Sequence, residues 1–343
     1  MTDTELSTLI ISSATSPGGP SDDADEGDGS AELELRRTVV PAGNHGDRLD
    51  RALAGIVPEF SRSYLQQLIE AGEVELNGVK VTKASARVKA GDACIIALRP
   101  TPQSQAFKPE AMELDIVFED PCLMVINKPA GLVVHPAPGN WSGTLLNGLL
   151  AHDAQAAFLP RAGIVHRLDK DTSGLMVVAR QRSVMDQLVA LIAARDVSRE
   201  YVALAHGAWQ GARTRQVEMP IGRDPRNRLR MAAVDIEKTS GKAASTVVSL
   251  LQNAERYCLV KCKLHTGRTH QIRVHMAWLG HPLVSDALYG GAVAGGLTRQ
   301  ALHACRLAFV HPVTGETLEF RSRPPADMEA AIGALGLIYN ENQ

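Results

Sequence analysis

The sequence predicts an α+β fold made of a small and a large folded unit, and three observations support this prediction. Helical and strand patterns are interspersed without the regular period of a doubly wound sheet. An Asn-Gly pair at 77–78 separates two short alternating runs, which is the pattern of a β-hairpin. A polar, proline-bearing stretch separates the two units. The expected segments are a disordered acidic tail at 1–35, a small unit at 46–100, a linker at 101–109 and a large unit at 110–330.

The formal net charge of −2 hides a basic folded part. Residues 1–35 carry nine acidic residues and no Lys or Arg, which leaves 36 basic against 29 acidic residues, or +7, for residues 36–343. The tail has few large apolar side chains to offset the entropy lost on ordering, so we expect it to be disordered. A basic folded part makes nucleic acid a reasonable partner, although many enzymes with phosphorylated substrates share this feature.

The composition also indicates the cellular compartment of the protein. No apolar run approaches the length of a membrane span, and the N-terminus lacks the basic-then-apolar pattern of an export signal. Five scattered cysteines suit a reducing compartment better than a disulfide framework. We therefore expect a cytoplasmic protein without membrane contact. Cys258 and Cys262 share one side of an alternating strand pattern without a further Cys or His pair nearby, which favours core thiols over zinc ligands.

The small unit reads as two short helices followed by the hairpin. "GDRLDRALAGIV" carries apolar residues at helical spacing, and "SRSYLQQLIEAGEV" repeats the pattern with Gly72 at the place of a C-cap. The positive φ angles of a type I′ turn suit Asn77 and Gly78. Exposed-looking basic residues accompany these elements: Arg48, Arg51, Arg62, Lys80 and Lys83. This arrangement resembles the S4 RNA-binding module, but the pattern alone slightly favours a small α+β domain whose charges face water.

The large unit mixes strands and helices. "LMVINKPAGLVVHP" predicts a buried strand that ends at Asn127 and Lys128, and "REYVALAHG" and "YCLVKCKLHTG" predict two further strands. "SVMDQLVALIAARDV" predicts an amphipathic helix opened by Ser183 with Asp186 completing a capping box. "THQIRVHMAWLGHP" predicts a helix that starts at Thr269 and is stopped by Gly280 and Pro282.

The chemistry centres on "GIVHRLDKDTSGLMVVAR", residues 163–180. Asp169 lies between Arg167 and Lys170, a setting that by itself is typical of a surface ion pair. Here the glycine and apolar run that follow predict a turn entering a buried strand. A carboxylate at such a point is partly desolvated, so it needs a cation held close in order to stay ionised.

The candidate cations lie in "HTGRTHQIRVH", residues 265–275. Arg268 and Arg273 are both available, and Arg273 falls inside the predicted helix, where packing fixes a guanidinium for a bidentate pair with a carboxylate. Tyr201 brings a weakly acidic hydroxyl on a strand, although its residue type and strand position by themselves favour a core aromatic whose hydroxyl reaches water or backbone.

These stretches, together with "NKPAGLVVHPAPGNWSGTLLNGLL" and "QALHACRLAFVHPVTGE", resemble the RluA/RluD family of RNA pseudouridine synthases over residues 46–330. Within that family, a chain with an S4-like module is similar to the members of the RluD branch. The resemblance implies isomerisation of uridine, in which the C1′–N1 bond breaks and a C1′–C5 bond forms. It implies no metal, nucleotide or redox cofactor. The expected partner is RNA, most of all large-subunit (23S) ribosomal RNA in the pre-ribosomal particle, and the expected state is a monomer.

The resemblance also assigns roles. Asp169 is implied as the catalytic carboxylate, acting as nucleophile or as base toward a glycal-like intermediate; Arg273 is its ion-pair partner; and Tyr201 lies against the uracil and helps to remove the C5 proton. Arg167 is implied to fill the place left by a flipped base, while His166 supports the turn. The remaining expected RNA contacts are Arg268, Asn127, Lys128 and Arg62, although a strand-end "NKP" is equally consistent with a structural role.

Three alternatives remain open from the sequence. The same reaction on transfer RNA is one, and a binding-only ribosome assembly factor is another. A glycosidase is the third: it needs two carboxylates that flank the scissile bond. Asp171 is the only neighbour available for that role, and on a strand-like segment it lies too close to Asp169 to leave room for a sugar.

Overall fold

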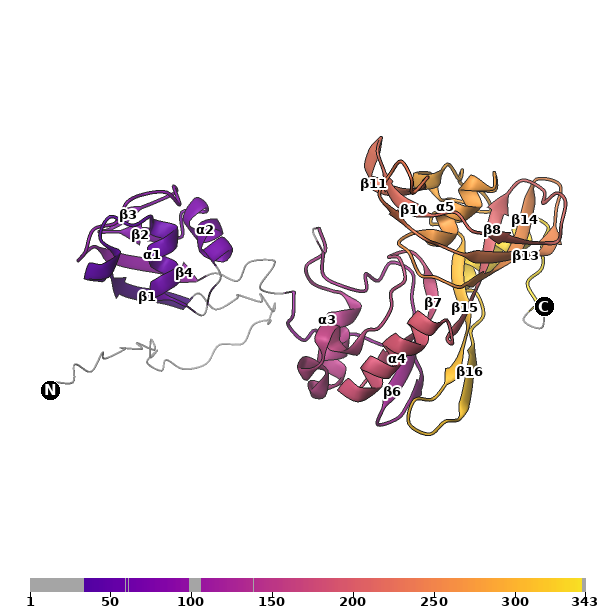
Figure 1. Cartoon of the computed structure of the whole chain (residues 1–343), viewed down its shortest axis with the longest axis horizontal. Coiled ribbons are helices and arrows are strands. Elements are labelled where there is room, and N and C mark those ends of the chain that lie inside the picture. Colours follow the sequence, from indigo (N-terminus) through magenta and orange to yellow (C-terminus); the bar gives the residue numbers. More distant parts are fainter. Residues whose placement is uncertain (1–33, 59, 61, 99–105, 138, 341–343) are drawn as a thin grey trace, which may run out of the picture. The chain divides into compact units, whose positions relative to one another are not determined.

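The computed structural model describes residues 34–58, 60, 62–98, 106–137 and 139–340. Close contacts divide the chain into two compact units that meet in sequence at Pro100 and Thr101. Figure 1 labels most of the helices and strands of each unit. The expected disordered tail, up to residue 33, and most of the expected linker lie outside the described residues. No helix in the described part of the chain is long and apolar enough to cross a membrane.

The first unit is a four-stranded antiparallel sheet with two helices. The sheet order is β1 (Glu34–Val39), β4 (Ala93–Leu98), β2 (Val74–Leu76) and β3 (Val79–Lys80). Helices α1 (Leu49–Ile56) and α2 (Arg62–Glu70) bury their apolar side chains with those of the sheet in one core. The turn between β2 and β3 has φ of 51° at Asn77 and 80° at Gly78, which confirms the predicted hairpin.

Strand β1 extends this unit beyond the expected boundary at residue 46. Its six residues pair along the full length of β4, so Glu34 and Leu35, which we had assigned to the acidic tail, are the start of a strand. The sequence of β1 is "ELRRTV", and Leu35 is exposed. A strand with so few buried side chains gives little hydrophobic pattern, because cross-strand hydrogen bonds and not burial hold it.

Asp50 ties α1 to α2. Its side chain is fully buried and accepts hydrogen bonds from Arg48 Nε at 3.0 Å, Arg62 Nη2 at 2.8 Å and Gln66 Nε2 at 2.6 Å. The hydrogen bond from Arg48 leads the interactions that hold the pKa of Asp50 well below its usual range, with Gln66 and Arg62 adding to it against the opposing effect of burial. The ionised carboxylate therefore stabilises the folded unit.

Asp50→Asn should lower the stability of this unit by about 1–3 kcal/mol, because charged donors lose their buried acceptor. The folded pKa is depressed, so this stabilisation is complete above about pH 4 and disappears as the pH falls toward the folded pKa. Hydrogen exchange of α1 and α2 amides in the full chain at pH 7 and pH 3 measures both effects. Asp47→Asn, which removes a surface pair with Arg51 at 3.8 Å, is the matched control. Equal exchange in both variants at pH 7 would contradict the role of Asp50.

The second unit is built on a mixed nine-stranded sheet (Figure 1). Its order follows as β5 (Ile116–Glu119), β6 (Leu123–Lys128), β7 (Ser173–Ala179), β15 (Leu302–Val310), β8 (Ser198–His206), β14 (Tyr257–Leu264), β13 (Thr246–Asn253) and β9 (Thr214–Val217), with β16 (Thr317–Arg321) paired to β15. The pair β7–β15 is parallel and the others are antiparallel. The predicted α+β class with a mixed sheet is confirmed.

Helices and a small sheet complete this unit. The remaining elements are α3 (Leu145–His152), α4 (Arg182–Ala194), α5 (Gln271–Trp278), α6 (Ala326–Ala334), short 3₁₀ turns including Ala287–Tyr289, and a three-stranded sheet of β11 (Asn227–Ala233), β10 (Ile221–Asp224) and β12 (Gly241–Lys242). Apolar side chains form clusters on both sides of the large sheet. Cys258 and Cys262 are buried in one of them, as expected for core thiols.

The parallel pair β7–β15 depends on one glycine. Gly174 has φ of 114°, and a Cβ there would lie 2.3 Å from the carbonyl oxygen of Ala304 on β15. Only glycine permits both this backbone conformation and this approach. Gly174 belongs to the "TSG" that follows Asp169. The close packing of β7 on β15 therefore fixes the strand that begins directly after the Asp169 turn.

Two helix starts differ from the predictions. Helix α4 begins at Arg182 with no side-chain cap, and Asp186 pairs with Arg182 at 3.1 Å, so the predicted capping box is wrong. Helix α5 begins at Gln271, after His270 in the left-handed conformation, and not at Thr269. The two starts differ from the predicted ones by one and two residues, because the preceding backbone and not a side-chain cap sets where each helix begins. The predicted stop of α5 at Gly280 is confirmed by its φ of 84°.

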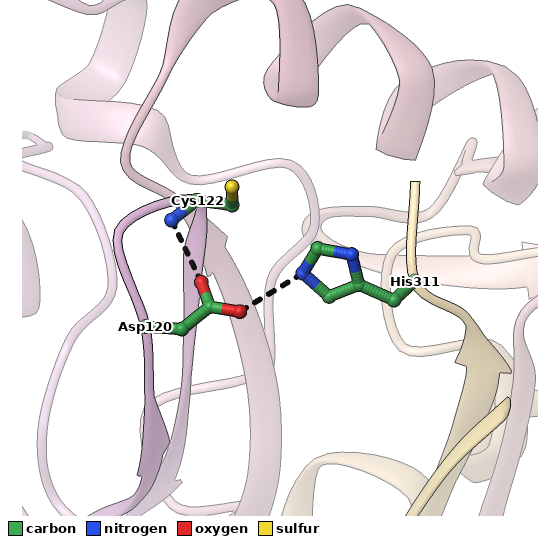
Figure 2. A group of neighbouring side chains, drawn as sticks. All are labelled: Asp120, Cys122 and His311. Atoms are coloured by element: carbon green, nitrogen blue, oxygen red, sulfur yellow. Dashed lines mark hydrogen bonds and ion pairs between the residues drawn. The ribbon is translucent and has the colours of Figure 1, made fainter. Parts of the chain in front are cut away.

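Asp120, Cys122 and His311 form a cross-brace between two turns of the large unit (Figure 2). The Asp120 carboxylate accepts the backbone N–H groups of Cys122 and Leu123, and its other oxygen lies 2.9 Å from His311 Nε2. His311 Nδ1 accepts the N–H groups of Val313 and Thr314, so the imidazole proton is on Nε2 and is donated to Asp120. With both ring nitrogens engaged in this way, the group is a structural link and a poor metal site.

Candidate active site

A cavity of about 850 Å³ opens in the large unit beside β8, α5 and the turn that precedes β7. Asp169 is the only acidic residue among its described lining residues, against six arginines: Arg161, Arg167, Arg195, Arg199, Arg268 and Arg273. This balance makes the cavity strongly attractive to anions, since walls of low dielectric focus the field of charges of one sign. Its volume is that of a pocket for a nucleotide-sized group.

Asp169 is held by an arginine that is itself fixed by a second acid. Arg273, on α5, donates from Nη1 to Asp169 Oδ2 at 3.1 Å and pairs in bidentate fashion with Asp286 at 2.7 and 2.8 Å. The exposed fractions of the three side chains fall from 15% for Asp169 through 8% for Arg273 to 1% for Asp286. The bidentate pair expected for Asp169 therefore belongs to Asp286, and the free face of Asp169 is open to the cavity.

Two further residues contact the Asp169–Arg273 pair. His270 Nε2 lies 3.9 Å from Asp169 Oδ2, and His270 Nδ1 lies 2.8 Å from the Tyr289 hydroxyl, which accepts the N–H of Met231. The Arg273 guanidinium stacks over the Tyr289 ring with a separation of 5.0 Å from the ring centre. Burial lowers the pKa of His270, and the charge of Arg273 lowers it further, while Asp169 opposes both. His270 is therefore neutral near pH 7.

The turn that carries Asp169 is anchored from below. Thr172 donates its N–H to the Asp169 carbonyl at 3.1 Å, and His166 Nε2 accepts the N–H of Val177 on β7. Burial, together with the charge of Arg199, lowers the pKa of His166 to about 3, so it is a neutral acceptor. This confirms the supporting position expected for His166.

Tyr201 lies on β8 and lines the same cavity. In the part of the chain that the structure describes, its hydroxyl has no hydrogen-bond partner. Burial raises the pKa of Tyr201 to about 12; the positive charge of Arg199 opposes this rise and the negative charge of Asp169 adds to it. Tyr201 therefore faces the cavity as a neutral phenol at pH 7.

The structure brings Asp169, Tyr201 and Arg273 into one cavity, together with Arg167 and Arg268. Arg167 is exposed at the cavity. Arg268 is also exposed and is held by a hydrogen bond from its Nε to the Ala243 carbonyl. Arg62 belongs to the other unit, where half of its side chain remains exposed beside Asp50.

Asn127 and Lys128 do not line the cavity, and the structure gives both of them other partners. Lys128 is 1% exposed and its ammonium donates to the carbonyl oxygens of Pro129, Leu132 and Lys170. Burial lowers its pKa to about 8. Asn127 bonds Asp115 and Ser322. The burial of Lys128 excludes an RNA contact at this residue. The structural role that "NKP" also allowed is the one found, because Lys128 anchors the turn that carries Asp169.

Sequence reasoning missed Asp286, His270, Tyr289 and Gln271. Gln271 accepts the Arg268 N–H and the Thr266 hydroxyl, and it donates to Ser245 and Thr246, so it holds the loop that precedes α5. The available signal was an acid inside the apolar run "PLVSDALYGG", where a carboxylate requires a buried cation.

A single open carboxylate held by one arginine, in a basic cavity on a mixed α+β sheet, is the arrangement of an enzyme site that accepts an anionic substrate. Residues 122–278 match the family described as RNA pseudouridylate synthase, and residues 47–94 match the S4 domain.

Relatives agree with these matches. "Ribosomal large subunit pseudouridine synthase D" of Neisseria meningitidis serogroup B is 45% identical over 94% of this chain and 88% of its own. The protein of the same name from Xanthomonas campestris pv. campestris is 42% identical over 91% and 96%. The solved structure "Human RNA Pseudouridylate Synthase Domain Containing 1" superposes with a TM-score of 0.51 at 26% identity, over 65% of this chain and 90% of that one. The chain belongs to the RNA pseudouridylate synthase family and is an isomerase that forms pseudouridine in RNA.

Asp286→Asn should slow pseudouridine formation about 10–100-fold with little change in RNA affinity, because it loosens the guanidinium that orients Asp169. Single-turnover rates and RNA binding, measured side by side, test this. Asp327→Asn is a matched control, since Asp327 makes the same bidentate pair with Arg299 outside the cavity lining. Equal loss in both variants would show a general effect of breaking an ion pair.

Proposed function

We propose that this enzyme isomerises uridine in large-subunit (23S) ribosomal RNA, as a cytoplasmic monomer that uses Asp169 as its catalytic carboxylate. The observation that supports the site assignment is the Asp169–Arg273–Asp286 arrangement in a cavity lined by arginines. The substrate assignment is supported by relatives named for the ribosomal large subunit at 42–45% identity over almost the whole chain, S4 domain included.

The reaction begins when the target uridine leaves the base stack, which costs a few kcal/mol. Arg167 is exposed at the cavity, where its guanidinium can take the place that the base vacates. The other exposed arginines of the cavity, Arg161, Arg195 and Arg268, face the phosphates of the same strand. The entry of a flipped nucleotide therefore places its sugar next to the free face of Asp169.

Asp169 then acts on the sugar. A single ionised carboxylate supports either attack on C1′ or removal of the C2′ proton, and in both routes the C1′–N1 bond breaks with its electron pair passing to the uracil. Arg273 and Asp286 keep the carboxylate in place without covering the face that reacts. A glycosidase is disfavoured, because Asp171 does not line the cavity and no second carboxylate flanks the bond there among the described residues.

Tyr201 serves the second half of the reaction. After the uracil turns and C5 bonds to C1′, the C5 proton must leave to restore the aromatic ring. Tyr201 packs against the base and passes this proton from C5 toward solvent through its hydroxyl. Since its pKa is about 12, it acts as a neutral phenol and not as a resident phenolate.

The S4 domain supplies RNA affinity. Arg62 on α2 and Arg51 on α1 contact phosphates, and such contacts weaken as salt concentration rises. Arg62 keeps half of its side chain exposed while it is paired with Asp50, so it is held in position and still available to RNA.

Asp169→Asn should abolish isomerisation while RNA binding survives, because the change removes the charge and keeps the shape. Tritium release from RNA that carries [5-³H]uridine, together with filter binding of the same RNA, separates the two effects. Asp171→Asn is the matched control, two residues along the same turn and outside the cavity lining. Near-wild-type turnover by Asp169→Asn would overturn the assignment.

Deletion of the gene should remove pseudouridine at one or a few neighbouring positions of large-subunit ribosomal RNA. Primer extension on bulk RNA, in which carbodiimide adducts of pseudouridine block the polymerase, detects the loss, and restoring the wild-type gene should restore the signal. Loss confined to transfer RNA would contradict the ribosomal substrate and keep the reaction. No change in any RNA would favour a binding-only protein.

A further inference from the structure

Arg199 is a buried cation that the steps above do not use. It lies on β8, its exposed fraction is 6%, and it lines the cavity. Its guanidinium makes no hydrogen bond or ion pair with any residue in the described part of the chain, and its Nε is buried without a partner. Arg273, which is buried to a similar degree, has two carboxylates instead.

An unpaired buried guanidinium is unfavourable in the free enzyme, because it has lost hydration without gaining an anion. Such a group is retained where a ligand supplies the missing partner. The neighbouring loop also leaves space for this guanidinium. A Cβ on Gly267, in the "HTGRT" loop, would lie 3.0 Å from Arg199 Nη1. The cavity therefore contains a preformed site for a negatively charged or electron-rich group.

Because Arg199 is buried in the cavity, it is placed to contact the base of the substrate and not its phosphates. Arg161, Arg167, Arg195 and Arg268 are exposed, and hydrated phosphates meet these residues first. Arg199 is buried and lies two residues before Tyr201 on the same strand, so both side chains project from one face of β8. Arg199 is almost fully buried and lines the cavity with Tyr201 and His166, which places it in the inner part of the cavity.

We propose that Arg199 binds the carbonyl oxygens of the flipped uracil and stabilises the negative charge that the base acquires when the C1′–N1 bond breaks. This inference rests on the proposed function and names a further catalytic residue in its site. The bonding pair passes to N1 and spreads onto the adjacent carbonyl oxygens, where the guanidinium donates. The anionic uracil then turns while it remains bound, C5 attacks C1′, and the C5 proton leaves. No oxidant, reductant or metal enters this balance.

The proposed role explains why Arg199 carries no partner among the residues that the structure describes. A carboxylate paired with Arg199 would compete with the base and would repel the anion as it forms. A donor that is already dehydrated and in place costs no reorganisation when the charge appears, which is the property of an effective oxyanion site. Asp169 and Arg199 thus act on opposite ends of the scissile bond, one on the sugar and the other on the base.

The test compares Arg199→Gln and Arg199→Lys with wild type on a large-subunit ribosomal RNA transcript that carries [5-³H]uridine. At saturating enzyme, Arg199→Gln should release tritium about 100-fold more slowly than wild type, with an RNA dissociation constant within about threefold of wild type, because the phosphate contacts stay intact. Arg199→Lys keeps the charge and should fall between the two. Arg182→Gln removes an arginine that is paired with Asp186 on the exposed face of α4, and it should match wild type.

Thermal unfolding of the free enzyme gives a readout that needs no activity. Arg199→Gln should unfold at a temperature equal to or above that of wild type, since it removes an unpaired buried charge. A drop of several degrees would show a structural arginine and overturn the inference.

A weaker RNA affinity with an unchanged single-turnover rate would show a phosphate contact and also overturn it. A wild-type enzyme that releases no tritium from this RNA would contradict the proposed substrate, whereas an Arg199→Gln variant as fast as an active wild type would contradict this inference alone.

Discussion

The organisation of the large unit depends on one buried ion pair, the bidentate contact between Arg273 and Asp286. A guanidinium and a carboxylate that are almost fully buried are tolerated only when each satisfies the other. Once this pair is in place, it fixes α5 against the turn that contains Asp286, and the remaining Nη1 of Arg273 reaches Asp169. Asp169, the proposed catalytic carboxylate, is thus held by a cation that is already paired with Asp286, and its other oxygen stays open to the cavity.

A second constraint is the turn that presents Asp169. Its lower side is held by Lys128, whose ammonium reaches the Lys170 carbonyl from the end of β6, and by His166, which accepts the N–H of Val177 on β7. Gly174 lets β7 approach β15 directly behind the turn. Lys128, His166 and Gly174 therefore hold the turn in place, and none of these three residues adds a negative charge to the cavity.

The arginines of the cavity divide by depth. Those at the surface are hydrated and suited to phosphates, which contribute affinity that does not depend on sequence. The two buried ones have separate tasks in the proposed mechanism: Arg273 holds Asp169 beside the sugar, and Arg199 is proposed to receive the charge of the departing base. Burial makes these two interactions strong, because the surrounding protein screens charge poorly. The cost of burying Arg199 without a partner lowers the stability of the free enzyme in favour of the bound state.

The sequence by itself determined the α+β class, the hairpin at Asn77 and Gly78, the buried strands and the dense stretches that contain Asp169, Tyr201 and Arg273, because these follow from local patterns and contiguous motifs. It did not reveal β1, whose polar residues are held by cross-strand hydrogen bonds, or the true start of α4. Only the tertiary structure decided that Arg273 pairs first with Asp286, that Lys128 anchors a turn, and that Arg199 has no partner among the described residues. Each of these depends on contacts between residues far apart in the chain, and whether a charged side chain is paired, buried or open to a cavity is set by folding and not by its neighbours in sequence.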